Sequence, residues 1–135
     1  MTLANVGARE YPQTVESAFP RALTPLERGI LDFLLAAEFQ GVRELREQAK
    51  TAVVTGLCDC GCPSFNLAVD ASCAAADAVH LPVEARGRKT GGDYVELLLF
   101  VVDGLLVGIE LLFYGEPPRE FPSLDAFDAP IVRTA

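Results

Sequence analysis

Cysteines at three alternate positions give this chain its most concentrated chemistry. Cys58, Cys60 and Cys62 are separated by one residue each, and Cys73 and His80 follow further along the chain. Thiolates and imidazole nitrogens are the ligands of tetrahedral zinc, and proteins commonly supply them as cysteine pairs two to four residues apart. The C-x-C-x-C spacing departs from that pattern, because adjacent thiolates cannot easily take up the geometry of a zinc knuckle. If the chain does bind a metal ion, the candidate ligands are Cys58, Cys60, Cys62 and Cys73.

Two other interpretations of these cysteines stay open. Cys60 and Cys62 can form a strained, easily reduced disulfide, which would make the cluster redox-responsive. Alternatively, the stretch is a turn in which cysteine serves as a small apolar residue. His80 either closes a metal site or faces solvent on a strand. The atypical spacing favours the turn, so the sequence predicts no cofactor, with zinc as the alternative.

Glu96 and Glu110 are the second set of candidates, because they flank the apolar segments on either side of Asp103-Gly104. An Asp-Gly pair favours a two-residue hairpin turn, which would put the two carboxylates on opposite faces of the sheet. A three-residue loop would instead place them directly opposite each other, where like charges are destabilising unless a proton or metal is shared. We expect the tight turn, hence no catalytic carboxylate pair. Enzymatic function has the least support, since the sequence contains no histidine pair and no nucleophile or phosphate-loop motif.

The elements that must position these residues follow from hydrophobic periodicity. Thr24 and Glu27 predict a capping box at the start of a first helix, and apolar residues then recur at helical spacing to residue 37. A short charged helix follows at 42–50. Alternating or β-branched patterns predict strands at 51–58, 65–70, 79–86, 94–102 and 105–114. The predicted fold is α+β, with two N-terminal helices packed on a meander-like antiparallel sheet of about five strands.

The chain length suits one domain. With 135 residues it can bury a hydrophobic core without disulfides. Residues 1–21 show no sustained period and contain two prolines, so we expect a mobile N-terminal tail. Residues 22–135 form the single α+β domain.

The hairpin over 94–114 has consequences for partners, because both of its faces are mostly apolar. A half-exposed antiparallel sheet should alternate apolar and polar residues, so each face needs a cover. The two helices cover one face, and the other needs the C-terminal segment 115–135 or a second protein chain. A homodimer or a protein partner is therefore expected. The candidate partner-binding residues are Glu96, Leu97, Leu99 and Glu110.

The charge of the chain restricts the kind of partner. A formal net charge of −8 argues against a nucleic acid, whose phosphates require clustered lysine and arginine. Residues 51–135 carry 12 acidic and 5 basic residues, which favours a basic protein partner. The N-terminus lacks the pattern of a secretory signal, and the most apolar window, 97–109, is too short to span a membrane. We expect a cytoplasmic protein with reduced cysteines.

Several segments resemble a group of small uncharacterised bacterial proteins for which no activity is established. The resemblance covers roughly residues 22–125 and rests on LTPLE at 23–27, FQGVRELREQ at 39–48, CGCP at 60–63 and VELLLFVVDG at 95–104. It implies no catalytic residues. By analogy at the level of the fold, small acidic α+β proteins of this sort are sometimes immunity proteins for toxins. Our leading hypothesis is a non-enzymatic protein-binding module, of the immunity or regulatory kind, for a basic partner. The alternative is a metal- or redox-responsive protein that uses the four cysteines.

Overall fold

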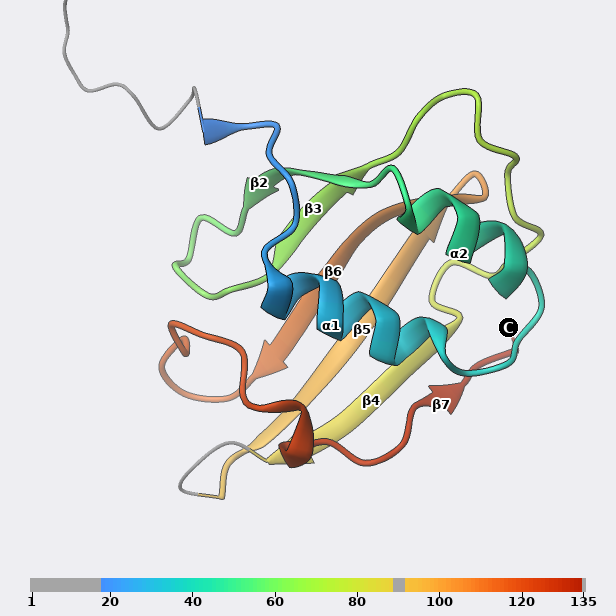
Figure 1. Cartoon of the computed structure of the whole chain (residues 1–135). Helices are drawn as coiled ribbons and strands as arrows, with labels where there is room; N and C mark the ends of the chain where they lie inside the picture. The colour runs from blue at the N-terminus through green and yellow to red at the C-terminus, as the bar shows by residue number, and fades with distance from the viewer. Residues whose placement is uncertain (1–17, 89–91, 135) are drawn as a thin grey trace, which may run out of the picture.

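The computed structural model describes residues 18–88 and 92–134. Two helices and a six-stranded sheet confirm the expected α+β class, with one strand more than predicted (Figure 1). The elements in chain order are α1 (Pro25–Leu35), α2 (Val42–Ala49), β2 (Val53–Leu57), β3 (Phe65–Ala68), β4 (Val83–Arg88), β5 (Tyr94–Val102), β6 (Leu105–Phe113), the 3-10 turn η2 (Leu124–Ala126) and β7 (Ile131–Val132).

The strand order of the sheet is β2-β3-β6-β5-β4-β7, and every pair is antiparallel. Only β4, β5 and β6 form the expected meander, because β3 pairs with β6 rather than with β4. The connection over 69–82 explains the difference. It passes the tip of the β5–β6 hairpin, where the Ala76 N–H donates to the Gly104 carbonyl at 2.8 Å, and so delivers β4 to the far side of β5. The two longest strands therefore occupy the centre of the sheet.

The first helix begins with the predicted capping box. The Thr24 hydroxyl accepts from the Glu27 N–H at 3.1 Å, and the Glu27 carboxylate accepts from the Thr24 N–H at 2.9 Å. Arg21 donates to the same carboxylate at 2.8 Å and pairs through its backbone with Val54 of β2. Of the expected tail, residues 1–17 lie outside the described residues. Residue 21 contacts the domain, and so does Phe19, which packs against the core.

The second helix is joined to the sheet by a buried amide. The Gln48 Nε2 donates to the carbonyls of Ala74 and Gly104, at 2.9 Å each, and its Oε1 accepts from the Leu106 N–H at 3.0 Å. Three segments distant in sequence therefore meet at one side chain. Because Gln48 is completely buried, its amide depends on these partners for its hydrogen bonds.

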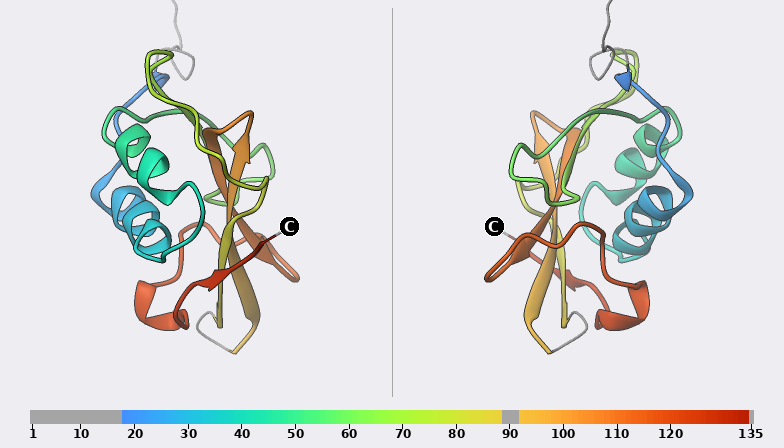
Figure 2. Two further views of the ribbon diagram at one scale, coloured as in Figure 1. Left: turned by 90° about the vertical axis from the view of Figure 1, so that its right-hand side faces the viewer. Right: turned by 90° about the vertical axis from the view of Figure 1, so that its left-hand side faces the viewer.

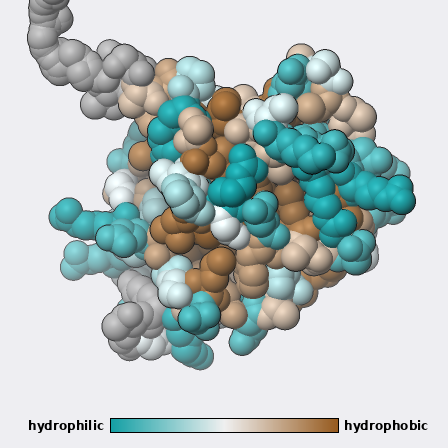
Figure 3. Space-filling view, in the orientation of Figure 1, coloured by the Kyte–Doolittle hydropathy of each residue, from teal (hydrophilic) through white to brown (hydrophobic). Residues whose placement is uncertain are grey.

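The two helices lie together on one face of the sheet (Figure 2). The core lies between these layers, and Figure 3 shows the helix side, where hydrophilic side chains surround smaller apolar patches. The C-terminal segment also packs on this side: the Phe121 ring meets Phe65 edge-on, with centroids 5.9 Å apart, and Leu124 lies beside Gly29 of α1. Of the two covers expected for the second face, the C-terminal segment or a second chain, the segment supplies little, because its aromatic residues extend the helix-side core.

The opposite face of the sheet carries no helix among the described residues (Figure 2). We call this surface the open face. It comprises the outward side chains of β3, β4, β5, β6 and β7. None of the described helices is long and apolar enough to cross a lipid bilayer.

Candidate functional site

The three clustered cysteines lie in the loop that joins β2 to β3. This loop is closed at its base by the Cys58 N–H, which donates to the Ser64 carbonyl at 3.1 Å. A second hydrogen bond, from the Gly61 N–H to the Cys58 carbonyl at 3.3 Å, turns the chain back on itself. Gly61 has a φ of 93°, a conformation that favours glycine. Pro63, two residues later, has its own φ fixed by its ring. The loop thus forms a compact turn rather than a zinc knuckle.

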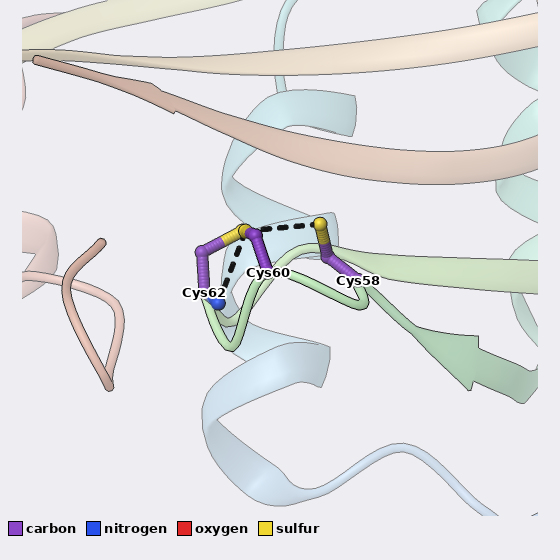
Figure 4. A group of neighbouring side chains, drawn as sticks. All are labelled: Cys58, Cys60 and Cys62. Atoms are coloured by element: carbon purple, nitrogen blue, oxygen red, sulfur yellow. Dashed lines mark hydrogen bonds between the residues drawn. The ribbon is translucent and has the colours of Figure 1, made fainter. Parts of the chain in front are cut away.

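The turn brings all three sulfurs to one side of the loop (Figure 4). Their Sγ atoms lie within 4.8 Å of one another, and those of Cys58 and Cys60 are 3.1 Å apart. The Cys62 N–H donates to the Cys60 Sγ at 3.4 Å. Cys58 and Cys60 are exposed, whereas Cys62 is buried, and all are free thiols. This arrangement can hold a metal ion.

The protonation of the cluster is uneven. The pKa of the Cys60 thiol is raised to about 11, mainly by the hydrogen bond between Cys58 and Cys60. Burial alone would raise the pKa of Cys62, but hydrogen bonding to Ser64 and to the other two cysteines outweighs burial and lowers it. The Ser64 hydroxyl oxygen accepts from the Leu111 N–H at 2.8 Å and from the Cys62 thiol at 3.2 Å. Cys62 is therefore more readily deprotonated than Cys60.

The other two residues named with the cluster lie elsewhere. Cys73 follows β3 and its sulfur is 3.7 Å from the Thr51 hydroxyl, at the opposite end of the β2–β3 hairpin from the turn. His80 is exposed, and its Nδ1 is 2.8 Å from the Val101 carbonyl. The structure thus brings together three of the four predicted ligands. The fourth, Cys73, is separated from the turn by the length of the strands.

The tip of the β5–β6 hairpin has the predicted two-residue turn. Asp103 and Gly104 both have positive φ values, 53° and 79°, and Val102 pairs with Leu105. Both positive values indicate a type I′ turn, whose twist matches that of the flanking strands. The register expected at Asp103-Gly104 is confirmed.

The expectation that Glu96 and Glu110 lie on opposite faces is wrong. Phe100 pairs with Gly108 whereas Val101 pairs with Leu106, so Val107 is an extra residue in β6. Such a β-bulge reverses the alternation beyond it. Both carboxylates consequently face the open side, where Glu96 lies opposite Leu112 and Glu110 lies opposite Leu98.

Glu96 is instead coupled to a carboxylate that the sequence did not single out. Glu84 on β4 is only 1 % exposed and lies opposite Leu98, so it too belongs to the open face. Arg86 donates to it at 3.1 Å, Arg133 donates from the C-terminal segment, and Arg86 is 3.4 Å from Glu96. In sequence, Glu84 has the pattern of an outward residue on an alternating strand. No signal there indicated that two arginines and Glu96 would bury it.

The pKa values of Glu84 and Glu96 are shifted in opposite directions. Burial would raise the pKa of Glu84, but hydrogen bonds from Glu96, Arg133 and Arg86 outweigh it and lower that pKa. Burial and the adjacent Glu84 raise the pKa of Glu96. Because both arginines neutralise Glu84, this is an ion-paired group that ties the C-terminal segment to β4.

Two of the predicted partner-binding residues are not on the surface. Leu97 and Leu99 are completely buried, since the alternation of β5 points them into the core beneath the helices. The apolar residues of the open face are their neighbours, which are partly exposed. These residues are Leu98, Phe100 and Val102 on β5, and Leu105, Val107 and Leu112 on β6.

A groove of about 350 Å³ lies on the open face. The floor of this groove includes Gly108, where a Cβ atom would come within 2.9 Å of the Phe65 carbonyl of β3. Phe100 and His80, with ring centroids 5.2 Å apart, and Cys58 also line it. The groove therefore joins the apolar centre of the open face to the edge of the thiol cluster.

Comparison with protein families, with curated proteins and with solved structures finds no match to this chain.

Proposed function

We propose that this protein is a non-enzymatic protein-binding module and that its open face binds a second copy of the chain. One observation carries the proposal: the open face bears six apolar side chains on β5 and β6, yet the helices and residues 121–127 of the C-terminal segment pack on the other side of the sheet. An antiparallel sheet with a solvated face normally carries polar residues there. A contiguous apolar surface on one side of a small domain is typical of an interaction site.

The energetics favour covering this surface. Removing apolar surface from water contributes about 25 cal/mol per Å², so each 100 Å² covered contributes about 2.5 kcal/mol. The six residues include Leu98 and Phe100 in the central strand of the sheet, with Leu112 and Val107 on the adjacent strand. Side chains at these positions form one continuous surface, because cross-strand neighbours lie within contact distance.

The charges of the open face favour a second copy over a strongly basic partner. Arg86 and Arg133 are half-exposed on the β4–β7 side, and Glu110 is exposed on β6. A two-fold axis parallel to β5 would place β4 of one copy over β6 of the other. It would thereby bring Arg86 of each copy towards Glu110 of its neighbour. Such isologous contacts are the commonest arrangement in homodimers.

Sedimentation equilibrium of the full chain and two variants tests the proposal. Leu98→Asp places a charge at the centre of the open face and should convert the dimer to a folded 14.5 kDa monomer. Leu26→Asp is the matched control, because Leu26 is 46 % exposed on α1, on the helix side. This control should remain a dimer. Circular dichroism of both variants checks that each is folded.

Two outcomes contradict the proposal. Either the unmodified chain is a monomer throughout the micromolar range, or the Leu98→Asp variant is folded and still dimeric. A monomer that instead binds a basic protein through Leu98 would support the regulatory or immunity role and reject the second copy as the partner.

A metal-responsive role is the second candidate function, and the close approach of three cysteine sulfurs favours it. The sequence predicts no cofactor and names zinc as the alternative. Tetrahedral zinc at Cys58, Cys60 and Cys62 would need a fourth ligand, which a water molecule would supply. Zinc analysis of protein purified without chelator tests this candidate, which is independent of self-association.

A further inference from the structure

We propose that Cys58, Cys60 and Cys62 form a three-coordinate, all-sulfur site for a soft monovalent cation, with copper(I) as its ion. The inference rests on the metal-responsive candidate function and specifies the ion. It depends on the number, type and exposure of the ligands that the turn between β2 and β3 presents.

The size of the cluster suits one ion bound to three sulfurs. Metal–thiolate bonds of about 2.3 Å place three ligands around a central ion with their sulfurs about 4 Å apart. All three Sγ atoms already lie within 4.8 Å of one another, so no strand has to move. The closest pair, Cys58 and Cys60 at 3.1 Å, has to separate by less than 1 Å, and both side chains are exposed and free to rotate.

In the described part of the chain, no further histidine, cysteine or carboxylate ligand atom lies within 4.8 Å of all three sulfurs. The only cluster of three or more metal-binding side chains found there contains these cysteines alone. Cys73 lies at the other end of the hairpin beside Thr51, and the His80 Nδ1 is at the Val101 carbonyl. A structural zinc site is normally closed by four protein ligands. Thiolate-only ligation instead suits soft ions, of which copper(I) is the common example.

Hydrogen bonds fix the positions of two of the sulfurs. The Cys62 N–H donates to the Cys60 sulfur at 3.4 Å, and the Cys62 thiol donates to the Ser64 hydroxyl at 3.2 Å. Hydrogen bonds around a metal site orient its ligands. Each thiol that ligates the ion releases its proton to solvent, and the oxidation state of copper does not change.

The exposure of the site indicates exchange rather than a structural role. Cys58 and Cys60 are exposed, so an incoming thiol donor can reach the ion directly. The side chains of Cys58 and Cys60 are not part of the hydrophobic core between the helices and the sheet. We therefore expect the fold to persist without the ion, as in a protein that acquires and releases it.

Anaerobic titration with copper(I) against the chromogenic chelator bicinchoninate tests the inference on the full, reduced chain. We expect one copper(I) per chain, with binding lost or weakened at least about tenfold in Cys58→Ser and Cys60→Ser. Cys73→Ser is the matched control and should bind as the unmodified chain does. Since Cys58 and Cys60 are exposed, thermal melting should show all of these variants folded. A parallel zinc titration with a colorimetric indicator should give weaker binding.

The outcomes separate this inference from the candidate function on which it rests. Stoichiometric zinc without copper(I) would overturn the copper(I) site and leave a metal-responsive role standing. Binding of neither ion to the fully reduced chain would overturn both. Loss of copper(I) in Cys73→Ser, or its retention in both Cys58→Ser and Cys60→Ser, would show that the ligands lie elsewhere and would also overturn the inference.

Discussion

Replacing Gln48 by methionine should destabilise the fold substantially although the side chain keeps its length and helix propensity. Methionine fills nearly the same volume and is about as good a helix former as glutamine. The substitution therefore removes three hydrogen bonds and little packing. Those bonds join α2 to the Ala74 carbonyl, the Gly104 carbonyl and the Leu106 N–H.

The three partners are not equally affected. The Leu106 N–H is buried and loses the acceptor that Gln48 supplies, which costs about 1–3 kcal/mol. The Gly104 carbonyl still accepts from the Ala76 N–H, and Ala74 is exposed and can be hydrated. Their combined loss is about 1 kcal/mol. The expected decrease in the free energy of unfolding is about 2–4 kcal/mol, or about 10 °C in Tm for a chain of this size.

Urea denaturation followed by circular dichroism measures this difference. Gln40→Leu is the matched control, because the Gln40 amide makes one hydrogen bond, to Asp77, at an exposed site. That variant should lose less than about 1 kcal/mol. If Gln48→Met unfolds within 0.5 kcal/mol of the unmodified chain, a margin of about the size of ordinary surface substitutions, then this buried amide does not hold the helix to the hairpin.

Three further variants test other parts of the structure. Glu27→Gln keeps the capping hydrogen bond but removes the ion pair with Arg21, and should cost about 0.5–1 kcal/mol at pH 7. Because that ion pair and the capping bonds outweigh burial and lower the pKa of Glu27, this difference should shrink as pH falls below the ordinary value of 4.5, as pH-dependent melting would show. Glu96→Gln should raise Tm at pH 7, because burial and Glu84 raise the pKa of Glu96, so that its ionisation opposes folding. The gain in Tm should vanish below pH 4.5, where Glu96 is protonated in both the folded and the unfolded chain. A lower Tm at pH 7 would refute this assignment. Gly87→Ala should cost about 1–3 kcal/mol in chemical denaturation, because its Cβ would overlap the backbone of the C-terminal segment; an unchanged midpoint would argue against that close approach.

The features that could be predicted from the sequence are those set by neighbouring residues. Thr24 and Glu27 are three positions apart, so the capping box depends on local chemistry alone, and the structure contains it. Asp103-Gly104 likewise determines its own turn, because the backbone angles required there suit those two residues.

The features that were missed depend on contacts between distant segments. The bulge at Val107 forms where β3 approaches Gly108, and no residue within β6 alone indicates where the alternation shifts. This bulge alone moves Glu110 to the face of the sheet opposite the predicted one. The burial of Glu84 likewise depends on Arg133, which is 49 positions away in the sequence.

The candidate site was predicted in part for the same reason. Cys58, Cys60 and Cys62 lie in one short turn, so local geometry was enough to bring them together. Placing Cys73 requires the register and length of the β2–β3 hairpin, which the spacing of cysteines does not contain. Leu97 and Leu99 were assigned to a partner surface because both faces of the hairpin are apolar. Only the position of the helices decides which face is the core.

Contacts between two copies of the chain test the central claim most directly. An isotope-filtered NOE experiment on an equal mixture of labelled and unlabelled protein detects only contacts between copies. If the open face is the dimer interface, the Leu98 methyl groups should show intermolecular NOEs to the Phe100 ring. Intermolecular NOEs confined to the helix side, for example at Leu26, would contradict the account. Their absence at every concentration up to 1 mM, where even a weak complex worth about 4 kcal/mol would be half-formed, would also contradict it.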